Sequence, residues 1–342
     1  MKVERYDNVE GLRGTPVRAA LRRFQAEDPN SGFFQSPEYM EFIHPVRGFK
    51  PVLLVARDAR EEVVGSLLGV FQRDGAGLKS WMSRRLIVHG GPLGGEDAAR
   101  ALLSALLEDA NGKAIYVEFR NSFRTDHLRT VFEGCGFTFT PHLNFIVGLT
   151  GEEQAMNKLT PNRRRQVRNG LAAGAVLQKG ATDPELRALY SLFSTLYREK
   201  VHKPLPDYSL FKRFQESPLG RVLLVKHDGR VIGGSLGAVY EGRVSYQWFA
   251  YGDNAVEGAH ASVLATWAHI AHAAREGHTT FDFMGAGKPG QGYGVHEFKS
   301  RFGGTEVNYG RYGKVLEPTL YKLGVFALGA YHRMVRGVHA KS

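Results

Sequence analysis

Hydrophobic and polar positions follow the same order in two stretches of the chain. Residues 52–71 read VLLVARDAREEVVGSLLGVF, and residues 222–240 read VLLVKHDGRVIGGSLGAVY. Each contains an apolar run, a polar turn and a second apolar run with a glycine, which is the pattern of a β-hairpin. Each leads through a further strand to a helix and another strand, at residues 114–120 and 279–284. The repeat predicts an α/β fold of two similar domains with mixed sheets and a cleft between them; chance similarity of two hairpins is the alternative.

Helix start signals divide the chain further. A capping side chain followed by proline marks three starts, at Thr15-Pro16, Ser36-Pro37 and Thr160-Pro161, and Asp183-Pro184 marks a fourth. Longer helices are expected over residues 97–110, 184–200 and 258–276. We place a first domain at residues 1–150, a second at 151–315 and a C-terminal amphipathic basic helix at 316–342.

Composition limits the class of protein. With 43% apolar and 23% charged residues, the chain is typical of a soluble globular protein. It has no run of eighteen apolar residues, so no transmembrane helix is expected, and its N-terminus MKVERYDNVEG lacks the apolar core of a signal peptide. The single cysteine, Cys135, fits a reducing cytoplasm, which is the expected location. The net charge of +11 indicates an acidic partner: RNA, a phosphorylated metabolite or an anionic membrane face.

The helix that begins at Pro161 carries an unusual concentration of cations. Arg163, Arg164, Arg165 and Arg168 lie in its first two turns, where the helix dipole already disfavours positive charge by a few tenths of a kcal/mol per residue. An anion bound by amide N–H groups and guanidinium groups would account for the arrangement. We therefore predict that Arg164, Arg165 and Arg168 bind substrate; a solvated basic face is the alternative.

A second group of candidates lies in FDFMGAGKPGQGYGVHEFKSR, residues 281–301. An apolar strand ends there in a glycine-rich loop, the kind of place where ligands bind in open α/β sheets. Lys299 is positioned to stabilise a phosphate or a developing oxyanion, and Tyr293 in the loop is a candidate for substrate binding. Asp282 is a candidate general base, as is Glu297, and proton transfer assisted by the substrate is equally open.

Several kinds of site are excluded by their missing motifs. No His-Glu-x-x-His or Cys/His spacing indicates zinc, no phosphate-binding G-x-x-x-x-G-K-[ST] loop is present, and no G-x-S-x-G turn offers a nucleophile. We predict no metal and no tightly bound cofactor. Direct transfer between a donor and an acceptor amine needs only positioning and charge stabilisation, and it remains compatible with the sequence.

The stretch from Leu320 to Val338, LYKLGVFALGAYHRMVRGV, is amphipathic and basic. Such a helix is suited to rest on an anionic membrane surface. Packing of the helix on its own domain is the alternative. The expected location is therefore cytoplasmic, with peripheral contact at the inner membrane face as an open prediction.

Taken as a set, these stretches resemble the FemAB/FemX-like branch of tandem GNAT-fold transferases, which overlaps the BioF2-like acyltransferases. The resemblance runs from FFQSPEYMEFI at residues 33–43 through RRRQVRNGLAAGAV to FDFMGAG and YGVHEFKSRFGG. It implies two GNAT-like domains and the transfer of an amino acid from aminoacyl-tRNA to an amine of a peptidoglycan precursor. It also implies that Lys299 stabilises the transition state, that Arg164 grips a diphosphate and that Tyr251 lines the same cleft.

Two departures from the family's pattern fall in the first domain. A Pro-Arg-Gly-Pro-like turn is replaced by His89-Gly90-Gly91-Pro92, and a lysine expected after the Gln-Ser motif is missing near Ile43. Both put the peptidoglycan acceptor in doubt more than the transfer chemistry. Residues 256–261, VEGAHA, match the coenzyme A turn of ordinary GNAT enzymes poorly, which favours aminoacyl-tRNA over acyl-CoA as the donor.

Three functions follow, in order of preference. The first is an N-(amino)acyltransferase acting on an anionic, phosphorylated or lipid-linked cell-envelope precursor, with tRNA as a candidate partner. The second is a CoA-dependent N-acyltransferase of polysaccharide or small-molecule metabolism. The third is a catalytically silent protein that binds RNA or a membrane.

Overall fold

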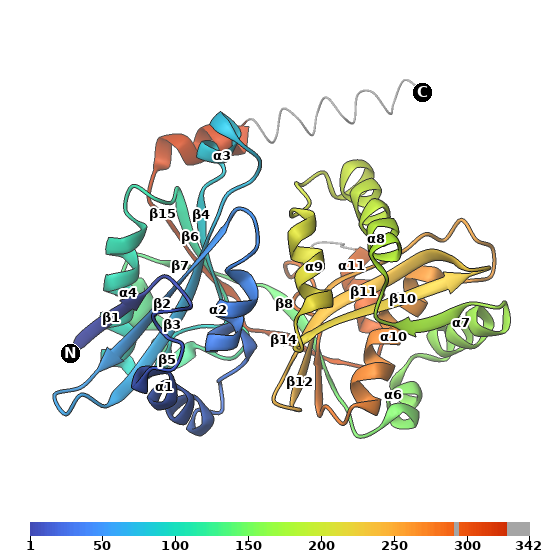
Figure 1. Cartoon of the computed structure of the whole chain (residues 1–342), viewed down its shortest axis with the longest axis horizontal. Helices are drawn as coiled ribbons and strands as arrows, with labels where there is room; N and C mark the ends of the chain where they lie inside the picture. The colour runs from blue at the N-terminus through green and yellow to red at the C-terminus, as the bar shows by residue number, and fades with distance from the viewer. Residues whose placement is uncertain (291–293, 327–342) are drawn as a thin grey trace. The chain divides into compact units, whose positions relative to one another are not determined.

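The chain forms two compact units. The computed structural model describes residues 1–290 and 294–326 (Figure 1). The first unit comprises Met1–Thr140 with Gly310–Ser342, and the second comprises Pro141–Tyr309. The predicted Tyr293 and most of the predicted C-terminal helix lie outside the described residues.

The first unit is built on an eight-stranded mixed sheet with the order β1-β2-β3-β4-β6-β15-β7, to which β5 adds beside β3. Its strands are β1 (Lys2–Tyr6), β2 (Phe49–Arg57), β3 (Val63–Gln72), β4 (Arg85–His89), β5 (Leu93–Gly94), β6 (Tyr116–Arg120), β7 (Thr138–Thr140) and β15 (Arg311–Val315). Its helices are α1 (Pro16–Glu27), α2 (Pro37–Ile43), α3 (Gly77–Met82), α4 (Glu96–Ala110) and α5 (Arg129–Gly134), with 3-10 turns at Phe33–Gln35 and Asp126–Leu128.

The second unit is built on a seven-stranded mixed sheet with the order β14-β8-β13-β12-β11-β10-β9. Its strands are β8 (Leu143–Gly148), β9 (Val176–Lys179), β10 (Gly220–His227), β11 (Arg230–Tyr240), β12 (Val244–Gly252), β13 (Thr280–Asp282) and β14 (Thr305–Asn308). Its helices are α6 (Glu152–Lys158), α7 (Pro161–Ala172), α8 (Asp183–Leu196), α9 (Tyr208–Glu216), α10 (Ala261–Arg275) and α11 (Gly294–Ser300), and a π-helical turn, Tyr197–Val201, extends α8.

The two units repeat one arrangement. In the first, β4 and β6 run parallel and β15 lies between β6 and β7; in the second, β12 and β13 run parallel and β8 lies between β13 and β14. Because β8 pairs within the second sheet and β15 within the first, the units differ from the domain boundaries predicted at residues 150 and 315. The predicted α/β fold of two similar modules with mixed sheets is confirmed.

Both predicted hairpins form, and both carry a bulge near the turn. β2 pairs with β3, and β10 pairs with β11 through the turn at Asp228-Gly229, where both residues have positive φ. Of the predicted helix caps, Ser36 and Thr160 accept hydrogen bonds from Tyr39 N and Arg163 N. Two cap predictions are wrong.

The first is the side-chain cap of Thr15: α1 begins at Pro16 as predicted, with Thr15 in the N-cap position, but its hydroxyl donates to Leu12 O and makes no capping hydrogen bond. The second is Asp183, which is already helical. Thr182 caps α8 in its place, in a capping box with Glu185. A capping box requires a Glu or Gln three residues after the cap, and Glu185 satisfies that spacing from Thr182.

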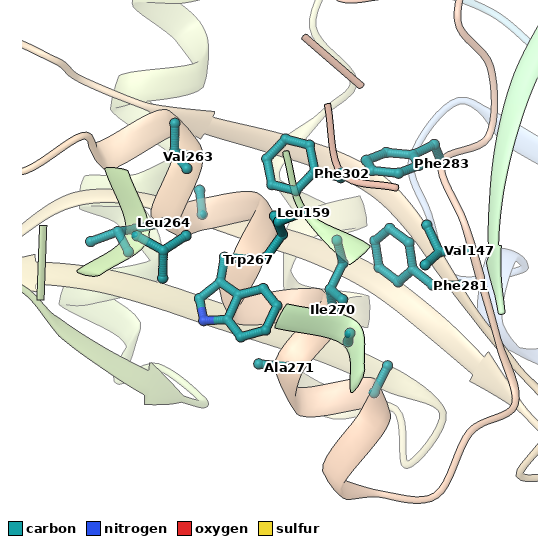
Figure 2. Packing of buried hydrophobic residues seen from close by; sticks show 14 of the residues in the cluster. Val147, Leu159, Val263, Leu264, Trp267, Ile270, Ala271, Phe281, Phe283 and Phe302 are labelled. Carbon is teal, nitrogen blue, oxygen red and sulfur yellow. The ribbon is translucent and has the colours of Figure 1, made fainter. Parts of the chain in front are cut away.

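Helix α10 forms the centre of the core of the second unit. Ser235 on β11 hydrogen-bonds His269 of α10, while a Cβ at the adjacent Gly234 would meet Leu189 of α8. Because successive strand residues point to opposite faces, α10 and α8 cover opposite faces of the sheet. Trp267 and Ile270 belong to the same buried cluster as Val147 of β8 and Phe281 of β13 (Figure 2).

One carboxylate ties the end of α10 to the sheet. Glu276 lies 2.8 Å from Lys179 Nζ of β9 and 2.9 Å from Arg221 Nε of β10, and its other neighbours are His272 and His278. Burial acts to raise the pKa of the Glu276 carboxyl, but the hydrogen bonds from Lys179 and Arg221 outweigh it and lower the pKa to about 2.

Replacing Glu276 with glutamine is expected to destabilise the second unit by about 1–2 kcal/mol at pH 7, after allowance for solvent screening. A carboxyl whose pKa is lowered on folding contributes stability above its unfolded pKa, and loses that contribution as the pH falls through its folded pKa. The difference between wild type and Glu276→Gln should therefore shrink between about pH 4.5 and pH 2. Urea unfolding across this range measures it, and a constant difference would contradict the assignment.

In the described residues, no helix combines the length and the apolar character needed to cross a membrane. Residues 318–326, after β15, are helical, which agrees with the start of the predicted C-terminal helix. Residues 327–342 of that helix are not described.

Candidate active site

The strands β12 and β13 of the second unit are paired in parallel over only a short stretch. Their register joins Val244 to Thr280 and ends at Tyr246 opposite Asp282, although β12 continues to Gly252. Beyond Tyr246, β12 therefore has no described strand on that side. The corresponding pair in the first unit, β4 and β6, stays in register to the end of β4 at His89. Only the second of these two parallel pairs opens in this way.

The end of β13 holds a buried acid. Asp282 is 5% exposed, and its Oδ1 accepts hydrogen bonds from Asn144 Nδ2 of β8 and from Met284 N, both at 2.6 Å. Burial raises the pKa of Asp282, against the hydrogen bonds from Asn144 and Met284. Asn144 also accepts from Gly285 N through Oδ1 at 2.7 Å, so this one side chain fixes both the acid and the following loop.

Lys299 is anchored at the same strand end. Its Nζ donates to Phe283 O at 2.9 Å and to Gly285 O at 2.6 Å, from its place near the end of α11. Burial of the ammonium group lowers the pKa of Lys299 to about 8, against the opposing effect of the nearby Asp282. An ammonium group has three N–H donors, and the two carbonyls engage two of them. In the described residues, the third N–H of Lys299 has no hydrogen-bond acceptor.

Arg163 points inward and holds α11. It is 5% exposed, and its guanidinium lies over the rings of Phe298 and Phe302, at 4.5 and 5.0 Å from their centroids. It also donates to Phe298 O at 3.4 Å and to Gln166 Oε1 at 2.8 Å. Burial lowers the pKa of Arg163 to about 10. Because Phe298 precedes Lys299, Arg163 sets the position of the helix that carries the lysine.

The other arginines of α7 face differently. Arg164 is half-buried and donates to Leu159 O, and Arg165 is exposed and donates to Asn162. Arg168 is exposed and has no ion pair among the described residues. None of the three makes a hydrogen bond or an ion pair with Lys299 or Asp282 in the described residues, so their predicted substrate binding stays a prediction.

Tyr251 lies in the part of β12 that has no β13 neighbour. Its ring packs 6.1 Å from the ring of Phe193 on α8, and burial raises its pKa, with smaller effects of Asp253 and Glu199. The strand thus places Tyr251 along the opening between β12 and β13, but the structure gives no ligand contact for it. Tyr293 lies outside the described residues.

The side chains of Asn254 and Ser262 hold the turn before α10 through hydrogen bonds to its backbone. Asn254 Oδ1 accepts from Ser262 N, and Ser262 Oγ donates to Gly252 O. A Cβ at Gly170 of α7 would lie 2.5 Å from Ala259 O, so α7 packs directly on this turn. In the described residues, no group of three or more His, Cys, Asp or Glu side chains is placed to hold a metal ion.

Sequence reasoning missed three of these features. They are the inward direction of Arg163, the hydrogen bonds by which Asn144 holds Asp282 and Gly285, and the hydrogen bond from Ser262 N to Asn254. The spacing of Arg163, Val167 and Gly170, all on the buried face of α7, is a signal that was available for the first. Asn144 and Asp282 are 138 residues apart, and no local pattern links them.

Comparison with known proteins gives a family match within the second unit and solved structures with a similar fold over most of the chain. Residues 158–300 match the acetyltransferase (GNAT) domain family. No curated protein is similar enough in sequence to count as a relative. Among solved structures, FemX is similar over 94% of this chain and 99% of its own, with 15% identity and a TM-score of 0.65.

Two further structures share the fold. L-PGS from Bacillus licheniformis is similar over 94% of this chain and 98% of its own, with 15% identity and a TM-score of 0.56. A tandem GNAT protein from the clavulanic acid biosynthesis pathway is similar over 92% of this chain and 99% of its own, with 12% identity and a TM-score of 0.58. At these identities the similarity defines the fold. The match of residues 158–300 to the acetyltransferase (GNAT) domain family is what supports acyl transfer as the class of reaction.

Proposed function

We propose that this chain, which has the tandem GNAT fold of the FemAB/FemX-like proteins, is an N-(amino)acyltransferase acting on an amine of a cell-envelope precursor, either peptidoglycan or a lipid-linked glycan. The observation that carries the proposal is Lys299, whose ammonium is anchored by two backbone carbonyls beside the opening between β12 and β13. The similarity to FemX and to L-PGS supports an envelope substrate.

In the proposed reaction, the acceptor amine attacks the carbonyl carbon of the donor ester or thioester. A bond forms between nitrogen and carbon, and the carbonyl oxygen gains negative charge in the tetrahedral intermediate. The remaining N–H of Lys299 stabilises that oxyanion. Because the ammonium group is already held in place, no rearrangement of the protein is needed when the charge develops. The intermediate then expels the donor hydroxyl or thiol, which takes up a proton as the amine gives one up.

Asp282 is better suited to hold the strand end than to accept a proton freely. Its Oδ1 already accepts from Asn144 and from the amide of Met284, and the acid lies buried at the end of β13. Its negative charge favours the protonated form of Lys299. We propose that Asp282 keeps Lys299 cationic, and that the acceptor amine loses its proton to another group.

Two features favour an aminoacyl-tRNA donor. The first is the turn before α10, where Ser262 N is already capped by Asn254; in a CoA-dependent enzyme, helix-terminal amides are suited to the pyrophosphate. The second is the net charge of +11, with Arg165 and Arg168 exposed on α7. A CoA-dependent N-acyltransferase is the second candidate, favoured by the match of residues 158–300 to the GNAT domain family.

The donor can be tested with the purified full chain. We expect transfer from aminoacyl-tRNA to an amine-bearing envelope precursor, and RNA binding that weakens steeply with added salt. The double variant Arg165→Ala/Arg168→Ala should weaken RNA binding, while Arg187→Ala, an exposed arginine paired with Asp183 on α8, serves as the matched control. Mass spectrometry of envelope precursors from cells with and without the protein identifies the acceptor.

Other outcomes assign a different function. Transfer from acyl-CoA, with thermal stabilisation by CoA and none by RNA, would replace the first function by the second. Binding of RNA without transfer from either donor would indicate a catalytically silent protein.

A further inference from the structure

The first unit exposes apolar side chains at one end of its sheet. Helix α3 buries none of its residues, and its Leu78 and Trp81 are 71% and 47% exposed. In the helical residues 318–326, Leu323 and Phe326 are 49% and 67% exposed. In each helix, the two residues are three positions apart and therefore lie on the same side.

The two helices belong to the same end of the sheet. Helix α3 leads into the start of β4, and residues 318–326 follow the end of β15, with β6 between these strands (Figure 1). Backbone bonds connect the three strand ends, because Ile115 N donates to Arg84 O while Leu316 N donates to Ile115 O. The ring of Tyr321 packs 5.7 Å from that of Tyr116 at the start of β6.

Cations accompany this apolar surface. Lys79 and Lys322 are exposed and have no ion pair among the described residues. The guanidinium of Arg84 lies 4.5 Å from the Trp81 ring centroid and donates to Trp81 O, which fixes the tryptophan at the surface.

We propose that this surface, made by α3 and residues 318–326 and called here the apolar–basic patch, docks on an anionic lipid bilayer. Tryptophan and tyrosine are favoured at the boundary between lipid and water, and apolar helix faces enter it. Each Lys or Arg near an anionic surface adds about 1 kcal/mol of attraction. A bilayer accounts for the exposed apolar side chains and for the unpaired cations together. The inference deepens the proposed function, since a membrane would bring the chain to a lipid-linked acceptor.

The test is sedimentation of the full chain with vesicles in a buffer of moderate ionic strength. Binding is expected to vesicles of phosphatidylcholine that contain roughly a third phosphatidylglycerol, and not to phosphatidylcholine alone. The double variant Leu78→Ser/Trp81→Ala should weaken the partition about tenfold or more, because two apolar side chains no longer enter the interface. Lys79→Glu should weaken it several-fold, and less so at high salt.

A matched control comes from the second unit, where Val176 is an exposed apolar residue at 59%. Val176→Ser is expected to bind vesicles as wild type does. Unchanged urea midpoints for the double variant would show that it folds, as expected for two exposed positions. Transfer with soluble substrates in the absence of vesicles should also be unchanged in the double variant, so failure of the docking proposal is distinguishable from failure of the proposed function.

Three results would overturn the docking proposal. The first is absence of binding, or equal binding to both kinds of vesicle. The second is full binding by Leu78→Ser/Trp81→Ala, which would assign the membrane contact elsewhere in the chain. The third is a concentration-dependent dimer that the double variant disrupts, without vesicle binding; the patch would then be an interface between two copies.

Discussion

Replacing Lys299 with alanine is expected to lower kcat/KM for group transfer by about 10²–10³-fold. This is the usual cost of removing one donor to an oxyanion. The ammonium is held by Phe283 O and Gly285 O and needs no rearrangement to meet the developing charge. The fall should appear in kcat, because the interaction is made mainly in the transition state. Steady-state kinetics with saturating donor measures it.

The pH profile separates a catalytic from a structural Lys299. The pKa of Lys299 is lowered to about 8, so the cationic form predominates below this pH and is lost above it. The wild-type rate should therefore fall as the pH rises through about 8. Lys299→Arg retains a charge at all accessible pH values, and any residual activity should lack this alkaline fall.

Alanine at position 299 also leaves two carbonyls without their donor, which costs about 1–3 kcal/mol of stability. Urea unfolding of the variant is the necessary check, and Lys212→Ala, an exposed lysine of α9, is the control. Transfer activity near wild type in a folded Lys299→Ala variant would remove the lysine from the mechanism.

Replacing Trp267 with alanine is expected to destabilise the second unit by about 3–5 kcal/mol. The indole is 2% exposed and lies among Leu264, Ile270 and Ala271 of its own helix and the residues of β8 and β13 (Figure 2). Truncation leaves a cavity that the surrounding helix and sheet cannot close. The urea midpoint of the second unit should fall accordingly.

The matched control for Trp267→Ala is Trp81→Ala on α3. Because Trp81 is 47% exposed, its truncation should change the free energy of unfolding by no more than about 0.5 kcal/mol. Equal losses of stability in the two variants would contradict the packing of Trp267 in the core of the second unit.

Local sequence patterns predicted most of the elements, because their signals depend on near neighbours. The hairpin over residues 222–240 rests on Asp228-Gly229, whose positive φ angles suit the tight turn. Ser36 and Thr160 cap helices as their spacing to proline predicted. The boundary between the two units was harder to predict. β8 and β15 pair with strands far away in sequence, and nothing in their own residues indicates which sheet they join.

The sequence singled out candidate residues for the site but gave no indication of their contacts. The resemblance singled out Lys299, and the structure places it beside Asp282 at the end of β13. Charge alone suggested that Arg164, Arg165 and Arg168 of α7 bind an anion, and it gave no separate role to Arg163. Arg163 lies under α11 because it shares a buried face of α7 with Val167. Its guanidinium packs on the rings of Phe298 and Phe302, which are 135 and 139 residues further along the chain.

The place of β15 bears on how the chain folds as it is synthesised. Among the strands that the structure describes, β7 pairs with β15 alone, and β15 is made after the whole of the second unit. The second unit is continuous in sequence from Pro141 to Tyr309. It can therefore reach its native structure on the ribosome while the earlier half still lacks a strand, so the half translated first is completed last.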